Sequence, residues 1–174
     1  MKAWRLSSLG GKFDLRDIPV PEVRPGTVLV RMEAVPILTY LGQFIAGKLP
    51  TYRPAEGEFT PGTNGVGVVE AIGDDVWSLK RGQRVLLSPH VVSSENVEEP
   101  AQVLAGLTAI SSDSAPMMEA WRDGTLAEYT LAPASTVTTV PDNLASPCRF
   151  GWAVNSNVLP TTIRFYESIG LLPP

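Results

Sequence analysis

The amino-acid sequence predicts a mainly β fold: a partly open antiparallel barrel with a few short helices and a short helical C-terminal tail. The first observation behind this prediction is that short apolar runs are separated by turns rich in glycine and proline, a pattern typical of barrels and sandwiches. The second is the run from Thr27 to Val35, where Val28 and Val30 alternate with Leu29 and Arg31. Such alternation is expected of a strand that presents two different faces.

The other predicted strands are short apolar runs bounded by turn residues. Gly10 and Gly11 separate the first two strands, and a turn at residues 24–26 precedes the third, because proline presets φ and glycine tolerates positive φ. Gly65 and Gly67 lie within a strand, which marks a β-bulge or a close backbone approach. The predicted strands are 3–6, 13–18, 27–35, 65–72, 84–87, 125–131 and 136–140.

Two segments break this pattern of strands. Residues 38–46 are predicted to form one or two helical turns that end at Gly47 as a C-terminal cap. Residues 88–122 are too long for an unstructured connection in a compact domain, so this segment is expected to have structure of its own. We predict short helices within it at residues 100–107 and 115–121.

The composition limits the possible classes of protein. A chain of 174 residues indicates one domain with an appendage, and its net charge of −4 argues against a dedicated nucleic-acid surface. The single cysteine excludes an internal disulfide, which is consistent with a cytoplasmic location. The start of the chain has no apolar signal core, and no run approaches the roughly 18 to 20 apolar residues of a membrane span. No membrane partner is therefore predicted.

Three motifs carry a resemblance to a known family. They are Pro61-Gly-Thr-Asn-Gly-Val-Gly-Val-Val-Glu-Ala-Ile-Gly73, Leu79-Lys-Arg-Gly-Gln-Arg-Val85 and Asp123-Gly-Thr-Leu-Ala-Glu-Tyr129. In this order and spacing they resemble the N-terminal GroES-like domain of the medium-chain dehydrogenase/reductase superfamily. The resemblance implies a GroES-like barrel over residues 1–144, which supplies the substrate side of an oxidoreductase. In that superfamily a separate doubly wound domain binds NAD(P)H.

We expect no such nucleotide-binding domain in this chain. The glycines between Gly62 and Gly67 are not a dinucleotide fingerprint, because a β-rich run follows them instead of a helix and their spacing is wrong. We interpret these glycines as structural. The chain alone is therefore predicted to bind no cofactor and, as a truncated oxidoreductase, to be inactive by itself.

Counting metal ligands argues against zinc. The whole chain contains one histidine, His90, and one cysteine, Cys148, whereas a zinc site needs three or four ligands. Zinc-dependent members of the family place a cysteine where this chain has residues 36–40 and a histidine where it has Thr63. They also hold a structural zinc on four cysteines in a lobe that corresponds to residues 88–122. The sequence therefore resembles the zinc-independent, quinone-oxidoreductase-like branch, which implies a small carbonyl, enone or quinone substrate.

Five polar residues are candidates for substrate binding in this branch: Thr39, Tyr40, Gln43, Thr63 and Asn64. Tyr40 and Asn64 are also the catalytic candidates, because a phenol or an amide could donate a hydrogen bond to a substrate oxygen. Two alternatives stay open. Tyr40 could be a half-buried packing residue with a hydrated hydroxyl, and Asn64 could be a turn residue in the left-handed conformation. His90 has no sequence partner that would make it a base.

The last 30 residues, 145–174, do not continue as the superfamily does. Residues 160–174 resemble the recognition helix of MerR-type regulators, which implies that Arg164 and Tyr166 contact DNA phosphates. The alternative function is thus a binding or scaffold module with a DNA-contacting tail. Arg149 and Arg164 are the only basic residues in this tail, so few phosphates could be neutralised, and this argues against DNA as a partner.

A GroES-like domain without its nucleotide domain is expected to expose apolar surface. The segment carrying Ile37, Leu38, Leu41 and Phe44 is the predicted patch. Exposed apolar patches tend to find partners. Two outcomes remain open: self-association into a homo-oligomer, or cover by apolar residues of the tail. Those residues are Phe150, Trp152, Ile163, Phe165 and Leu171.

Overall fold

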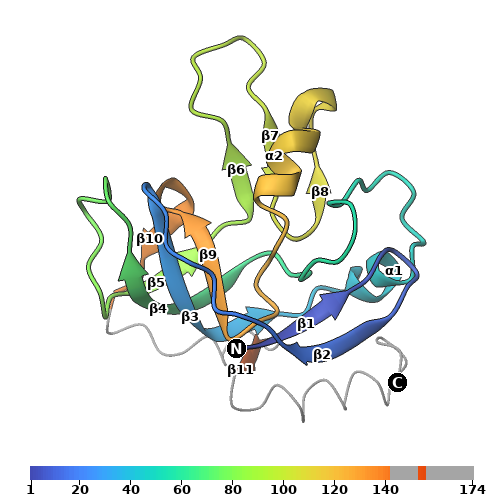
Figure 1. The fold of residues 1–174 in the computed structure, drawn as a ribbon, viewed down its shortest axis with the longest axis horizontal. Helices are drawn as coiled ribbons and strands as arrows, with labels where there is room; N and C mark the ends of the chain where they lie inside the picture. Colours follow the sequence, from blue (N-terminus) through green and yellow to red (C-terminus); the bar gives the residue numbers. More distant parts are fainter. Residues whose placement is uncertain (142–152, 156–174) are drawn as a thin grey trace.

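The computed structural model describes residues 1–141 and 153–155, and its fold is mainly β, as predicted (Figure 1). Within these residues lie two short α-helices, α1 (Leu41–Ile45) and α2 (Ala115–Ala120), and two 3-10 turns, η1 (Ser112–Ser114) and η2 (Ala134–Thr136). None of the described helices is long and apolar enough to cross a membrane. The strands are β1 (Lys2–Leu6), β2 (Phe13–Asp17), β3 (Thr27–Pro36), β4 (Gly65–Ile72), β5 (Arg84–Leu87), β6 (His90–Val92), β7 (Gln102–Leu104), β8 (Thr108–Ala109), β9 (Tyr129–Pro133), β10 (Val137–Thr139) and β11 (Ala153–Asn155).

The body of the molecule is a curled six-stranded sheet built around β3. The order runs β10-β5-β4-β3, and the other edge of β3 pairs with β9 along Thr27–Arg31 and with β11 along Ala34–Pro36. The predicted alternation in β3 holds only in part, since Thr27 and Leu29 are buried along with Val28 and Val30. Neighbouring strands on both sides and packing on both faces make this end of β3 central instead of half-exposed.

The glycines of β4 are structural, as the sequence analysis proposed. A Cβ on Gly67 would lie 2.3 Å from the Arg31 carbonyl oxygen, and a Cβ on Gly65 would lie 2.3 Å from the terminal methyl group of Met32. The register of β3 against β4 shifts between Met32 and Ala34, beside these glycines. The bulge expected from glycine in a strand is therefore present, and it bends the sheet where β3 and β4 meet.

The two-stranded sheet β1-β2 closes one side of the body through partners that are remote in sequence. The backbone N–H of Trp4 donates to the carbonyl of Leu126 at 2.9 Å, and that of Leu6 donates to Phe59 at 2.8 Å. Isolated bridges also join Ala3 to Ala127 and Leu6 to Phe59. The first strand of the chain is thus held by segments that come more than 50 residues later.

Residues 88–122 contain most of a lobe that the sequence did not predict in detail. Figure 1 shows it projecting from the body as the three-stranded sheet β6-β7-β8 with α2 packed beside it. Val91, Val103 and Met118 are buried in a small apolar cluster of its own. The predicted helix at 115–121 is confirmed as α2, but the one at 100–107 is wrong, because β7 pairs there with β6 and β8.

Two further boundaries differ from the sequence predictions. The strand predicted from residue 125 begins only at Tyr129, because Leu126 bonds to Pro61 and to β1 before the chain reaches β3. The helix predicted from residue 38 begins at Leu41, after a turn in which its N–H donates to the Leu38 carbonyl. It ends before Gly47, which has the positive φ of 69° expected at a helix C-terminus.

The prediction of an exposed apolar patch on this helix is wrong. Ile37, Leu41 and Phe44 are 6%, 5% and 0% exposed and belong to the main core, and Leu38, the fourth residue of the predicted patch, is half-buried. Phe44 packs against Tyr52 and Phe59 with ring centroids 5.6 and 6.2 Å apart. A short amphipathic helix can turn its apolar side inward within one domain, so these residues need no second domain to cover them. The apolar tail residues proposed as a cover lie outside the described residues.

The pairing of β11 with β3 leads to a prediction about residues 145–174. We expect deletion of residues 145–174 to lower the melting temperature and to raise self-association, because it removes the partner of Ala34–Pro36 and leaves an unpaired strand edge. Differential scanning calorimetry and light scattering measure the two effects. The full chain with Glu22→Gln, an exposed change in the body, is the control. An unchanged melting temperature together with an unchanged oligomeric state would show that β11 contributes nothing.

Candidate substrate-side site

Two of the sequence motifs meet in space at one turn. Residues 60–64 lie against residues 123–126, and four hydrogen bonds join the two segments. The N–H of Gly124 donates to the Thr60 carbonyl at 2.7 Å, and that of Leu126 donates to Pro61 at 3.1 Å. The hydroxyl of Thr125 donates to the Asn64 carbonyl at 3.0 Å. The position of Thr63 and Asn64 is therefore set by a segment about 60 residues away.

This contact is possible only because glycines line it. A Cβ on Gly124 would lie 1.9 Å from the carbonyl oxygen of Gly62, and one on Gly106 would lie 2.5 Å from the Gly124 Cα. Gly62 itself has φ of 114°, a conformation that side chains rarely adopt. Close backbone approach, and not phosphate binding, is therefore the role of the glycines in this turn.

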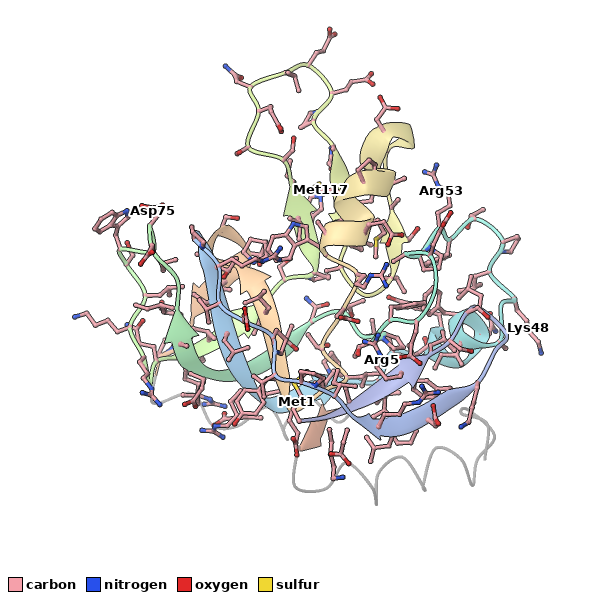
Figure 2. The ribbon with its side chains drawn as sticks, viewed as in Figure 1. Met1, Arg5, Lys48, Arg53, Asp75 and Met117 are labelled. Atoms are coloured by element: carbon pink, nitrogen blue, oxygen red, sulfur yellow. The ribbon has the colours of Figure 1, made fainter. Side chains whose placement is uncertain are left out.

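A buried arginine fixes the same region from the side of β1. Arg5, at the middle of the molecule in Figure 2, is 8% exposed. Its guanidinium bonds Asp123 at 2.6 Å, the Thr60 hydroxyl at 3.0 Å and the Glu58 carbonyl at 3.0 Å. Asp123 accepts a second bond from the Thr60 N–H at 2.7 Å. Arg5 thus connects β1 to both segments of the site. It can do so because a guanidinium group has several N–H donors in a fixed arrangement.

Two of the predicted site residues come together at this turn. Tyr40, just before α1, is half-buried, and its phenol lies near enough to Thr63, which is 7% exposed, for that side chain to influence its pKa. Burial raises the pKa of Tyr40 above its ordinary value of 10.0, the neighbouring Tyr52 raises it further, and the Thr63 side chain opposes both. The phenol is therefore held in its protonated form, which can donate a hydrogen bond.

The other three predicted residues are placed differently. Thr39 and Gln43 are exposed, and Asn64 is half-buried beside Thr63. The alternative interpretation of Asn64 as a left-handed turn residue is wrong, since Asp75 is the one non-glycine residue with positive φ in the described part of the chain. The alternative interpretation of Tyr40 was a half-buried packing residue with a hydrated hydroxyl. The packing part of it agrees with the structure, because the Tyr40 ring packs against the main core.

Tyr52 is a site residue that the sequence analysis missed. Its ring lies 6.2 Å from Tyr40 and 5.6 Å from Phe44, measured between centroids. It comes from the connection between α1 and β4, where no periodicity marks a buried face. The sequence therefore contained no signal that would have placed this residue beside Tyr40.

The described residues do not fit a nicotinamide cofactor. The glycine-rich turn leads into strand β4, and α1 and α2 are only 5 and 6 residues long. No helix N-terminus among residues 1–141 therefore follows a glycine-rich turn, the arrangement that binds pyrophosphate.

The sequence argued against a metal site, and it named Arg164 and Tyr166 as DNA-contacting residues only under the alternative function. Within the described residues no three His, Cys, Asp or Glu side chains are grouped as metal ligands. His90 is exposed, with Nε2 at 3.0 Å from Oε1 of Gln102, so it has a partner but no acidic one. Arg164 and Tyr166 lie outside the described residues.

Comparison with known proteins agrees with this architecture. Residues 24–142 match the model of the alcohol dehydrogenase GroES-like domain. The chain belongs to this family. It is therefore a GroES-like domain of the medium-chain dehydrogenase superfamily, as the three motifs suggested.

Relatives of this GroES-like domain include both alcohol dehydrogenases and quinone oxidoreductases. It is 27% identical to an alcohol dehydrogenase of Cupriavidus necator over 148 residues, covering 77% of this chain and 39% of that protein. It is 33% identical to the quinone oxidoreductase of Homo sapiens over 94 residues, covering 51% and 27% respectively. The crystal structure of an NAD-dependent alcohol dehydrogenase matches with a TM-score of 0.60 and 27% identity, covering 83% of this chain and 41% of that one. The chain thus spans less than half the length of these relatives.

Proposed function

We propose that residues 1–144 act as the substrate-side domain of a zinc-independent, NAD(P)H-dependent oxidoreductase that reduces a small carbonyl, enone or quinone. The observation that carries this proposal is that the half-buried phenol of Tyr40 lies beside the buried side chain of Thr63, near enough for Thr63 to influence its pKa. Thr63 stands at the position that the family resemblance assigns to a zinc ligand, and a hydroxyl cannot replace a histidine there. A neutral phenol can polarise a substrate oxygen by donating a hydrogen bond, without a metal.

The role of each residue follows from its environment. The Tyr40 phenol would donate to the substrate oxygen, and Thr63 would orient that phenol. Asn64, fixed by the bond from Thr125, would supply a second donor, and exposed Thr39 and Gln43 would lie on the solvent side. Hydride is the contribution of the nicotinamide, and because the described residues do not fit that cofactor, we propose that it binds to a domain other than this one.

The test of this proposal is quinone binding by the full chain. We expect duroquinone to quench tryptophan fluorescence saturably, and Tyr40→Phe to weaken its binding about fivefold, the equivalent of one hydrogen bond of about 1 kcal/mol. Tyr129→Phe, the same change at a half-buried tyrosine of β9, is the matched control and should bind as the unaltered chain does. Equal affinities of the two variants for duroquinone would show that Tyr40 does not contribute to quinone binding.

The zinc-independent assignment has a test of its own. Stoichiometric zinc in metal analysis of the purified chain would contradict that assignment.

A second expected result concerns the cofactor. Calorimetric titration of the full chain with NADPH should show no binding tighter than about 1 mM, the level of stray contacts. The physical reason is that no helix N-terminus cradles pyrophosphate within the described residues. Saturable micromolar binding would mean that the chain contains a nucleotide site. The quinone titration is independent of this result, so each claim can fail alone.

A further inference from the structure

The lobe carries a groove that the proposed function does not use. It is about 590 Å³ in volume, within the roughly 300 to 1,000 Å³ range of ligand sites, and it runs along strand β6. Val91 and Val92 of β6 line it together with Pro133 and Ser135 of the body. Met117, on α2 in the upper half of Figure 2, also lines it.

Strand β6 is an edge strand whose outer backbone groups are unpaired. Its inner side is fixed by the N–H of Ser93 donating to Ala101 at 2.9 Å and by the Pro89 carbonyl accepting from Ala105 at 2.8 Å. Because bonding positions alternate along an antiparallel ladder, Val91 bonds toward β7 while His90 and Val92 point their backbone groups outward. The N–H of His90 lies 3.3 Å from the Ser88 hydroxyl, but within the described residues the N–H and carbonyl of Val92 have no partner.

The same groove combines apolar residues with carboxylates. Val92 is 42% and Val97 56% exposed, and both line the groove. Glu95, Glu99 and Asp113 also line it, and none of the ion pairs found among the described residues involves them. The edge of β6 is therefore flanked by apolar side chains and unpaired negative charge.

The negative charge of the whole chain is concentrated in this lobe. Residues 88–122 contain five carboxylates, including Glu98 and Glu119, and one basic residue, Arg122. The rest of the chain contains 13 acidic and 13 basic residues, so it is balanced, and the net charge of −4 belongs to the lobe. A field of one sign beside an apolar groove favours a partner of opposite charge.

We propose that β6 accepts an extended, basic segment of another protein, which adds to the lobe sheet as a further strand. Its backbone would pair with Val92, its apolar side chains would pack on Val92 and Val97, and its Lys or Arg residues would face Glu95, Glu99 and Asp113. Strand addition of this kind draws affinity from main-chain bonds and specificity from alternate side chains. A second copy of this chain is a poorer partner, since pairing two β6 edges would bring two acidic lobes together.

The test uses the full chain and a fluorescein-labelled heptapeptide of alternating lysine and valine, with blocked ends. We expect fluorescence anisotropy to show saturable binding that weakens at least about tenfold when salt rises from roughly 0.05 to 0.3 M. A matched peptide of alternating glutamate and valine should not bind. A lysine–valine peptide with all of its backbone amides N-methylated should bind at least about tenfold more weakly, because neither of its edges can then complete a ladder. Equal binding of the N-methylated peptide would overturn strand addition in favour of simple charge attraction.

Variants of the chain locate the site. The double change Glu95→Gln and Glu99→Gln should weaken binding about tenfold, whereas Glu22→Gln, an exposed acidic residue of the body, should have no effect. Val92→Pro removes the outward N–H, a change that edge strands tolerate, and should weaken binding with an unchanged circular dichroism spectrum. If Val92→Pro disturbs folding, the N-methylated peptide on the unaltered chain still decides the question. If Glu22→Gln weakened binding of the lysine–valine peptide as much as the double change does, the proposed site at β6 would be wrong.

Discussion

Replacing Gly124 with alanine is expected to destabilise the folded chain by about 3 kcal/mol or more, which is at the upper end for overpacking. The added Cβ would lie 1.9 Å from the Gly62 carbonyl oxygen and 3.1 Å from the Gly106 Cα, so it would meet backbone that cannot rotate away. The expected loss corresponds to a fall in melting temperature of roughly 10 °C for a protein of this size. Thermal and urea unfolding followed by circular dichroism measure it.

Gly82→Ala is the matched control for this substitution. Gly82 has φ of 85°, but nothing lies within 4 Å of the position of its Cβ. Only backbone strain of about 1 kcal/mol is therefore expected there. A Gly124→Ala variant no less stable than Gly82→Ala would mean that the turn Pro61–Asn64 can move away from Asp123–Leu126. The close approach would then not define the site.

Arg5→Ala is expected to cost about 2 to 3 kcal/mol, somewhat less than the loss from a fully buried pair. The guanidinium is buried, but the carboxylates it leaves behind are 35% exposed in Glu58 and 47% exposed in Asp123, so water can partly replace it. The loss should also loosen the turn that holds Thr63, because Arg5 bonds the hydroxyl of Thr60 three residues earlier. Chemical unfolding measures the first effect, and hydrogen exchange at Thr63 and Asn64 measures the second.

Arg16→Ala is the control for Arg5, because both arginines pair with Glu58. The side chain of Arg16 is 40% exposed, and an exposed pair of this kind contributes less than about 1 kcal/mol. Similar losses in the two variants would indicate that charge near Glu58, and not the buried hydrogen bonds of Arg5, stabilises this region.

Local patterns predicted the body of the fold better than its lobe. The boundaries of β4 and β5 match the predicted residues 65–72 and 84–87, because turn residues flank both runs: Gly62 and Gly73 around β4, and Gly82 and Pro89 around β5. The lobe sheet was missed because β6 and β8 are 3 and 2 residues long, too short to show any alternation. Pairing between strands stabilises them, and pairing cannot be inferred from so short a stretch of sequence.

The motifs account for only part of the candidate site. Thr63 and Asn64 lie in a glycine-rich turn whose partner, Asp123–Leu126, was itself a motif. The contact of Tyr40 with Tyr52 and the burial of Arg5 depend on how distant segments pack, so composition and spacing gave no sign of them. The error over Ile37, Leu41 and Phe44 has the same origin, since their burial follows from contacts with Tyr52 and Phe59.

The pairing of β1 with Phe59 and Leu126 has a consequence for how the chain folds as it is synthesised. Lys2–Leu6 leaves the ribosome more than 120 residues before Ala127, which bridges to Ala3. Until then only β2 can pair with β1, and a two-stranded hairpin is marginally stable in water. The barrel can therefore close only after Ala127 has emerged, and apolar residues such as Leu6 and Phe13 stay exposed to other nascent chains in the interval.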